Sequence, residues 1–320
     1  ERGVPVFNAP GANANAVKEL VIASMLIAAR NLMPAWQFAQ SLTGDDAEIA
    51  QAVEAGKKQF TGIELPNRTL GVIGLGAIGS LVADAGIRLG MNVIGFDPEI
   101  TVEAAWRLPS GVQKAASVEE VVSNSDFVTL HVPLLDKTRN MIDAARIALM
   151  KPGAVLLNFA REGIVDDKAV VEGIASNKLR AYVCDFPSNA LKGHPRIITF
   201  PHLGASTEEA EENCAVMVAE QVRDYLENGN IRNAVNFPDV SMMRESAWRI
   251  AIANANVPNM VGQISTAMAE AGLNIHNMVN KSKGEMAYTL VDVDSEPPPP
   301  VIERIGKIKG VLMVRAIPAR

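Results

Sequence analysis

The sequence predicts an α/β protein in which a Rossmann-type, doubly wound parallel sheet precedes a smaller α+β domain of the ferredoxin-like kind. Strand-like apolar runs alternate with helical patterns from Leu70 to Phe200, which is typical of parallel strands covered by helices on both faces. After Pro238 the order changes to strand, helix, strand, strand, helix, strand over residues 249–317. A chain of 320 residues is also too long for one ordinary core, so two or three domains are expected.

The expected parallel strands are continuous apolar runs, because helices bury both faces of such a sheet. They lie at Leu70–Ile73, Asn92–Phe96, Asp126–His131, Ala154–Asn158, Ala181–Cys184 and Ile197–Phe200. Helical patterns between them cover Ile78–Leu89, Val118–Asn124 and Lys168–Asn177. Asp166 is placed to cap the last of these helices.

Three further segments have a predicted conformation. Ala14–Gln40 predicts one long helix whose broad apolar face packs either on a second surface or subunit, or within its own monomer. Ser206-Thr207-Glu208-Glu209 predicts a capping box that opens another long helix, ending at Asn228-Gly229. The prolines of Pro297–Pro300 predict a stiff surface loop in the polyproline II conformation.

Composition excludes several classes of partner. Hydrophobic residues make up 48% of the chain and charged residues 21%, with a net charge of −6, which argues against nucleic-acid binding. The two cysteines, Cys184 and Cys214, show no metal-ligand spacing and suit a reducing compartment, so no metal is expected. The longest apolar run, Leu20–Ala29, is too short to span a bilayer, and no leader is recognised. These features predict a cytoplasmic protein without a membrane partner.

A glycine-rich turn predicts a dinucleotide site. The segment from Gly74 to Gly79 matches the pattern GxGxxG between a predicted strand and a predicted helix. Gly74 permits the tight turn, Gly76 lets the backbone approach a pyrophosphate, and Gly79 lets the helix pack close to the strand. Ala77 and Ile78 begin the helix, whose first amide groups and positive dipole favour phosphate.

The next strand ends at Asp97, 18 positions beyond Gly79. A carboxylate at this point accepts hydrogen bonds from the adenine ribose hydroxyls and repels a 2′-phosphate. The sequence therefore predicts NAD rather than NADP as the cofactor.

Four polar residues, His131, Arg161, Asp185 and His202, follow the ends of predicted strands, where ligands bind in open α/β sheets. Hydride transfer from an alcohol needs a base, for which histidine suits neutral pH. It also needs a cation, and arginine binds a carboxylate well. On spacing alone, His131 and His202 are equal candidates for the base.

Three segments resemble the motifs of a known family, the D-2-hydroxyacid dehydrogenases. Asn158–Asp166 resembles their NxARGxxVD signature, His131–Leu134 their HVPLT segment, and Pro201–Thr207 their PHIGxST segment. Three motifs in the right order over this length make a specific match. The resemblance implies an NAD-dependent enzyme that acts on a small 2-hydroxy acid.

The resemblance also implies roles for individual residues. Arg161 grips the substrate carboxylate and His202 is the acid–base catalyst, so His131 becomes a cofactor-side residue. The other residues of these segments expected to contact the dinucleotide are Val132, Pro133, Phe159, Ala160, Asp185, Gly204 and Ala205.

One position departs from the family pattern. The family orients its histidine with a glutamate, and Asn189 falls where that carboxylate is expected. An amide oxygen can orient an imidazole but cannot stabilise the imidazolium by charge. Glu208 and Glu209 are alternatives, although both suit the N-terminus of a helix. Asn189 favours a second hypothesis, an NAD-binding regulatory protein without catalysis, whereas Arg161 and His202 favour an enzyme.

Both ends of the chain resemble one branch of the family, which oxidises 3-phosphoglycerate to 3-phosphohydroxypyruvate in the first step of serine biosynthesis. Gly3–Pro10 resembles its GIPVFNAP segment, and residues 249–320 resemble the ACT domain that senses serine in many members. Asn254, Asn256 and Asn274 match effector-binding positions, so serine is the expected effector. A glyoxylate or hydroxypyruvate reductase is the alternative within the family, but such enzymes usually lack the C-terminal domain.

The resemblance predicts a domain order of five parts. They are a remnant of the substrate domain (1–13), the NAD-binding domain (14–202), a helix returning to the substrate domain (203–236), a linker (237–248) and the ACT domain (249–320). Because most of the substrate domain would precede residue 1, this chain is expected to bind NAD and to turn over weakly. The apolar helix and the ACT domain predict a homodimer or homotetramer.

Overall fold

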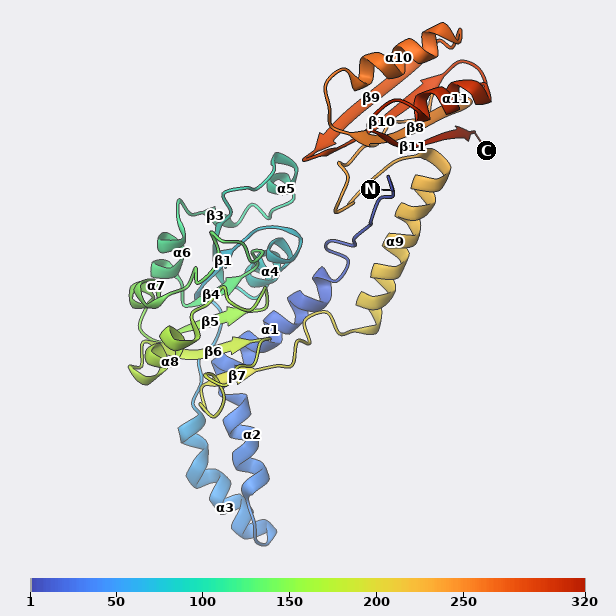
Figure 1. Cartoon of the computed structure of the whole chain (residues 1–320). Helices are drawn as coiled ribbons and strands as arrows, with labels where there is room; N and C mark the ends of the chain where they lie inside the picture. Colours follow the sequence, from blue (N-terminus) through green and yellow to red (C-terminus); the bar gives the residue numbers. More distant parts are fainter. Residues whose placement is uncertain (1, 320) are drawn as a thin grey trace. The chain divides into compact units, whose positions relative to one another are not determined.

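A computed structural model of the chain describes residues 2–319 (Figure 1). The chain forms two compact units. The parallel-sheet unit is Asn13–Glu211, and the antiparallel-sheet unit joins the described residues up to Ala12 with those from Glu212 onward. The boundary falls inside helix α9 (Glu208–Asn228).

The parallel-sheet unit has the predicted Rossmann topology. Its strands are β1 (Thr69–Ile73), β2 (Asn92–Phe96), β3 (Val112–Lys114), β4 (Phe127–Leu130), β5 (Ala154–Asn158), β6 (Leu179–Cys184) and β7 (Ile197–Thr199). All pair in parallel in the order β3-β2-β1-β4-β5-β6-β7. The order reverses at β1 and β4, which is where such sheets bind dinucleotides. The six predicted strands are confirmed, and β3 was not predicted.

Helices cover both faces of this sheet. They are α1 (Ala14–Arg30), α4 (Ala77–Arg88), α6 (Val118–Asn124), α7 (Ala144–Leu149) and α8 (Asp167–Ala175), whereas the short α5 (Val102–Trp106) is largely exposed. One apolar cluster contains Val121 of α6 and Val128 of β4, and a second contains Met25 of α1 and Val72 of β1. The central strands β1, β4, β5 and β6 are therefore buried on both sides, which explains their continuous apolar sequences.

The prediction of one continuous helix over Ala14–Gln40 is wrong, because the structure has two helices there. Asn31 adopts the left-handed conformation (φ 52°) and separates α1 from α2 (Leu32–Ser41). The face of α1 that carries Val21 and Met25 is buried against its own sheet unit, so the within-monomer alternative is confirmed for α1. Beyond Asn31 the chain forms an arm of α2, α3 (Asp46–Gly56) and a 3₁₀ turn (Lys57–Phe60) (Figure 1).

The antiparallel-sheet unit contains the predicted strand, helix, strand, strand, helix, strand order. Its elements are β8 (Trp248–Ala255), α10 (Met260–Glu270), β9 (Ile275–Lys283), β10 (Met286–Val293), α11 (Pro299–Gly306) and β11 (Val311–Pro318). The strand order is β11-β8-β10-β9 and every pair is antiparallel. Helices α10 and α11 share one apolar cluster with alternate residues of β8, Ile250 and Ile252.

The opposite face of this sheet is covered by the segment that the sequence assigned to a linker. Phe237, Val240 and Met242 are buried in one cluster with Ala251 and Tyr288 of the sheet. The side chains of Phe237, Val240 and Met242 therefore form part of the core of this unit.

A buried ion pair in this sheet also binds the segment that covers it. Arg249 and Asp292 are fully buried, with Nε to Oδ1 at 2.6 Å and Nη2 to Oδ2 at 3.0 Å. The guanidinium also donates to the carbonyls of Asn228, Met242 and Met243. With these bonds the charge is paired and its donors are satisfied, as burial of an arginine requires.

Two predicted local features are wrong in detail. Thr207, not Ser206, caps α9, because its hydroxyl accepts the Ala210 amide at 3.1 Å. A capping box between Ser206 and Glu209 would be one residue out of phase. The predicted proline loop ends early, since Pro299 begins α11. Proline suits a first helical position, where no intrahelical amide bond is lost.

Among the described residues, no helix combines the length and the apolar character needed to cross a membrane.

Candidate active site

The parallel sheet brings the predicted site residues to one edge. Gly74 follows β1, Asp97 follows β2, His131 follows β4, Arg161 follows β5, Asp185 follows β6 and His202 follows β7. Because all seven strands are parallel, their carboxyl ends lie at the same edge of the sheet, where ligands bind in this fold.

The glycine-rich turn has the geometry that a pyrophosphate needs. A Cβ on Gly79 would lie 1.9 Å from the Gly74 carbonyl oxygen, so α4 packs against the turn as only glycine allows. Gly74 itself has a φ of +91°, a region that favours glycine. A Cβ on Gly76 would meet nothing within 4 Å. The turn is thus closed toward the protein and open toward a ligand, with the N-terminus of α4 beside it.

Asp97 joins this turn to the loop that follows β2. Its Oδ2 accepts the Leu75 amide at 2.9 Å and its Oδ1 accepts the Glu99 amide at 2.9 Å. Each carboxylate oxygen has a further lone pair for a ribose hydroxyl. A cavity of about 700 Å³ adjoins Asp97, with apolar walls that include Leu75, Ile100 and Leu108. Its size and lining suit the adenosine half of a dinucleotide.

His131 is held as a neutral ring. Its Nε2 lies 2.9 Å from the Thr129 hydroxyl, and within residues 2–319 its buried Nδ1 has no partner. Burial lowers the pKa of His131 to about 3, because the charged form is poorly solvated there. A base that stays neutral at physiological pH and lies beside the turn fits the cofactor-side role better than proton exchange. The carbonyl of His131 touches the glycine turn, 2.5 Å from a Cβ built on Gly74.

Asn158 shapes the loop that carries Arg161. This buried side chain accepts the Ala160 amide at 3.2 Å and donates to the Arg161 carbonyl at 3.0 Å. Arg161 is exposed, and its Nη1 donates to the Ala160 carbonyl at 2.7 Å. Phe159 and Ala160 are buried. The base of the loop is thus buried and hydrogen-bonded, and the loop presents a guanidinium to solvent.

Asp185 organises the turn that carries His202. Its buried carboxylate accepts the amides of Leu203 at 2.7 Å and Gly204 at 2.6 Å, and its carbonyl accepts the His202 amide at 3.1 Å. His202 has a φ of 58°, an uncommon conformation for a residue other than glycine. Its exposed ring meets the Phe186 ring edge-on, with centroids 5.3 Å apart.

The remaining predicted residues lie around this edge. Val132 is half-buried and Pro133 is exposed in the loop after β4, and Ala205 is half-buried beyond Gly204. Asn189 is exposed, and in the described part of the chain its side chain makes no hydrogen bond to His202. Its predicted orienting role stays a prediction.

Thr129 and Asn158 contact predicted site residues but were not themselves predicted as site residues. Thr129 lies on β4 two positions before His131, which directly follows the strand, so the two side chains point to the same face. Asn158 opens the motif that ends in Asp166, and a buried amide at a strand end signals a loop contact.

The effector residues predicted for the antiparallel-sheet unit do not gather at one place. Asn254 and Asn256 are near the C-terminal end of β8, whereas Asn274 immediately precedes β9. The ladder pairs Ala255 with Met286 at one end of the sheet, and Val293 with Ile275 at the other. Asn274 is therefore separated from the other two by the length of a strand, about 25 Å.

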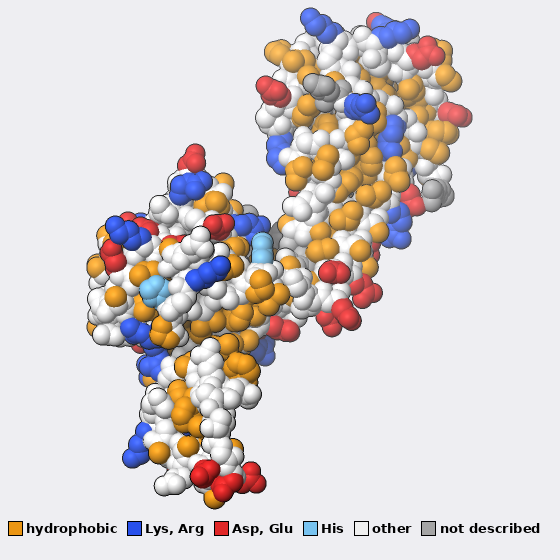
Figure 2. All heavy atoms as spheres, turned by 60° about the horizontal axis from the view of Figure 1, so that its bottom comes forward, with side chains coloured by type: hydrophobic (Ala, Val, Ile, Leu, Met, Phe, Trp, Pro, Cys, Tyr) orange, Lys and Arg blue, Asp and Glu red, His pale blue; other side chains and the backbone are white. Residues whose placement is uncertain are grey.

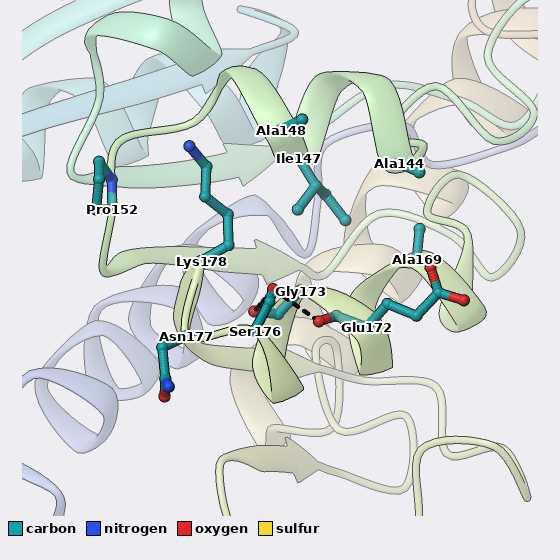
Figure 3. A pocket seen from close by; sticks show the side chains of 10 residues that line it. All are labelled: Ala144, Ile147, Ala148, Pro152, Ala169, Glu172, Gly173, Ser176, Asn177 and Lys178. Carbon is teal, nitrogen blue, oxygen red and sulfur yellow. Dashed lines mark hydrogen bonds between the residues drawn. The ribbon is translucent and has the colours of Figure 1, made fainter.

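A second cavity of the parallel-sheet unit has a different character. It measures about 590 Å³ and lies between α7 and α8 (Figure 3). Figure 3 shows small side chains such as Ala144, Ala148 and Ala169 along it, with Glu172 and Lys178 at its margin. None of the predicted site residues lines it. Across the described residues, no three His, Cys, Asp or Glu side chains gather as a metal site would require.

Comparison with known proteins identifies the class of protein. The family described as D-isomer specific 2-hydroxyacid dehydrogenase, NAD binding domain, matches residues 22–204. The chain belongs to this family, and it is an NAD-dependent oxidoreductase.

Three relatives that share one enzyme name indicate the branch of the family that this chain resembles. D-3-phosphoglycerate dehydrogenase of Haemophilus influenzae is 34% identical over 99% of this chain and 76% of its own length. The enzyme of that name from Methanocaldococcus jannaschii is 37% identical over 92% of this chain, which spans 54% of that relative. The Escherichia coli K12 enzyme of the same name is 31% identical over 99% of this chain and 77% of its own length.

Solved structures show the same fold. D-2-hydroxyisocaproate dehydrogenase gives a TM-score of 0.63 at 26% identity, covering 72% of each chain. D-lactate dehydrogenase of Aquifex aeolicus, solved with NAD and lactic acid, gives a TM-score of 0.58 at 24% identity, covering 72% of this chain and 73% of its own.

Proposed function

We propose that the protein oxidises the C2 hydroxyl of D-3-phosphoglycerate to give 3-phosphohydroxypyruvate, with NAD as the hydride acceptor. The observation that carries the proposal is the shared edge of the sheet, where the dinucleotide turn, the exposed guanidinium of Arg161 and the exposed imidazole of His202 follow parallel strands. The relatives named D-3-phosphoglycerate dehydrogenase support the choice of substrate.

Each residue has a defined part in this reaction. Arg161 binds the substrate carboxylate through its guanidinium and so fixes C2. The C2–H bond breaks with its electron pair, and the hydroxyl proton passes to the imidazole of His202, which leaves a ketone. When bound, NAD accepts the hydride at its nicotinamide ring. Asp185 acts on His202 through the backbone, because its carboxylate holds the amides of Leu203 and Gly204.

A substrate panel tests this function. The protein is incubated with NAD and either 3-phosphoglycerate, glycerate, lactate or glycolate, and NADH formation is followed. The proposal expects the highest kcat/KM with the phosphorylated acid, and loss of turnover without loss of NAD binding in His202→Ala. Higher kcat/KM for glycerate or glycolate would favour a hydroxypyruvate or glyoxylate reductase. Turnover unchanged in His202→Ala would contradict the assignment of the base.

We also infer that residues 249–320 are an ACT domain that binds serine. Asn254 is almost fully buried, its Nδ2 donates to the Ala255 carbonyl at 2.8 Å, and its buried Oδ1 has no partner in the described residues. Such an oxygen suits the ammonium group of an amino acid. Because Asn274 lies at the other end of the sheet, a site that uses all three asparagines requires two copies of the domain.

Calorimetric titration with serine tests this inference. We expect binding that Asn254→Ala and Asn274→Ala each abolish, while the exposed Asn213→Ala has no effect. Serine binding that survives both substitutions would remove the proposal.

We also propose that the protein is a homodimer or homotetramer in the cytoplasm. Leu32 and Trp36 of the arm are exposed by 46% and 60%, and Val53 of α3 by 38%. Figure 2 shows hydrophobic side chains along the arm, an arrangement typical of a protein interface. Light scattering is expected to give at least a dimer, and Trp36→Asp with Leu32→Asp is expected to lower the mass. A wild-type monomer would contradict the arm's role.

A further inference from the structure

An exposed ion pair joins two loops at the carboxyl edge of the parallel sheet. Lys137 lies in the loop after β4 and Glu99 in the loop after β2, and the Lys137 ammonium contacts Glu99 Oε1. In the sheet, β1 lies between β2 and β4. The pair therefore spans the end of β1, where the glycine-rich turn begins.

Hydrogen bonds connect this ion pair to the predicted dinucleotide site. The Glu99 amide donates to Asp97 Oδ1, and Asp97 Oδ2 accepts the amide of Leu75 in the glycine turn. Three loops that follow three neighbouring strands are thus connected through Asp97. We propose that Lys137 and Glu99 are positioning residues for NAD, which hold Asp97 and the glycine turn in their binding arrangement.

The exposure of the pair determines what it can do. Lys137 and Glu99 are 58% and 71% exposed, and ion pairs at such positions contribute little to the stability of a fold. The same contact can still affect the affinity for NAD. A loop that is already held in its binding arrangement loses less entropy when the ligand binds. The pair should therefore act on NAD affinity and leave the melting temperature unchanged.

A different role for Lys137 makes a different prediction. If its ammonium attracted the phosphates of the dinucleotide directly, Glu99 would compete with them, and removing Glu99 would strengthen NAD binding. In the positioning role, removal of either partner weakens binding, and removal of both is no worse than removal of one.

The experiment is a double-mutant cycle on the full chain. The Kd for NAD is measured by calorimetry for wild type, Lys137→Ala, Glu99→Ala and the double variant. We expect each to weaken NAD binding about two- to fivefold, with the double variant equal to the singles. The charge-swapped variant, Lys137→Glu with Glu99→Lys, should recover most of the affinity. In turnover, KM for NAD should rise while kcat stays constant.

A second exposed pair supplies a matched control. Lys57 and Glu54 on the arm are 2.5 Å apart and are 57% and 68% exposed, so Glu54→Ala and Lys57→Ala should leave the Kd for NAD unchanged. Tighter binding in Glu99→Ala, additive losses in the cycle, or a charge swap that fails to recover affinity would each overturn the positioning role. Absence of NAD binding by the wild-type protein would instead refute the cofactor assignment itself.

Discussion

The carboxylate of Asp185 is the acceptor for the turn that carries His202, since its Oδ2 lies 2.6 Å from the amide nitrogen of Gly204. Its Oδ1 accepts the amide of Leu203. Leu203 and Gly204 are the two residues after His202, so the carboxylate fixes the backbone on one side of a residue in the left-handed conformation. A charged group is used here to set a backbone geometry.

The first prediction concerns this carboxylate. In Asp185→Asn one of the two amides faces an NH₂ group, and a buried unsatisfied donor costs about 1–3 kcal/mol. We expect the His202 turn to loosen and kcat to fall about ten- to hundredfold, as measured by NADH formation. Asp136→Asn, at an exposed position of the same unit, should keep wild-type turnover. Equal turnover in the two variants would show that the turn does not need the charge.

A second prediction separates two glycines of the dinucleotide turn. Gly76 has a φ of −69° and open space where a Cβ would lie, so Gly76→Ala should fold normally. Its methyl group would occupy the approach to the pyrophosphate, and we expect NAD binding to weaken at least tenfold by calorimetry. Gly79→Ala should disturb the fold itself, because its Cβ would meet the Gly74 carbonyl at 1.9 Å. Gly306→Ala, which also meets open space, is the control and should bind NAD normally.

The third prediction is a pH dependence of stability that depends on His131. Its pKa is lowered to about 3 in the folded protein, whereas in the unfolded chain the ring takes up a proton near pH 6.5. Between these values the unfolded state binds more protons, so stability falls as the pH decreases, by up to about 1.4 kcal/mol per pH unit.

Urea unfolding at pH 7.5 and pH 5.5 measures this linkage. In His131→Gln, which cannot take up the proton, the free energy of unfolding should fall less over this range than in the wild type. Two parallel pH profiles would show that His131 is not responsible.

A fourth prediction concerns the buried ion pair of the antiparallel-sheet unit. Asp292→Asn leaves the fully buried Arg249 without its counter-charge, and such a loss costs about 3–5 kcal/mol. Guanidinium unfolding followed by circular dichroism should report it. The exposed pair of Arg304 and Glu270 gives the comparison, because Glu270→Gln should cost less than about 1 kcal/mol. Similar losses in both variants would contradict the role of burial.

Much of the sheet unit could be predicted from the sequence because its physical signals are local. Continuous apolar runs mark strands that are buried on both faces, and the glycine turn with Asp97 needs its residue types at fixed spacings. Strand β3 was missed because it is three residues long and largely exposed, with only Val112 half-buried. A short edge strand has no apolar signal of its own.

Features that depend on distant contacts could not be predicted. Asn31 has neither the ring of proline nor the freedom of glycine, and its left-handed conformation ends α1 only in the folded chain. Asp185 gave a signal as a polar residue at a strand end, but its bond to Gly204 joins positions 19 apart in sequence. The burial of Phe237 depends on the sheet residue Tyr288, whose ring meets it at a centroid distance of 6.1 Å.

The break at Asn31 has a consequence for how this protein can vary. The side-chain amide of Asn31 donates to the Phe60 and Thr61 carbonyls at 3.4 and 3.2 Å, and the backbone amide of Ile63 donates to the Ala29 carbonyl at 2.9 Å. The two ends of the arm are thus hydrogen-bonded to each other where the arm joins the parallel-sheet unit. A segment inserted at such a point can change in length while the nucleotide-binding sheet keeps its register.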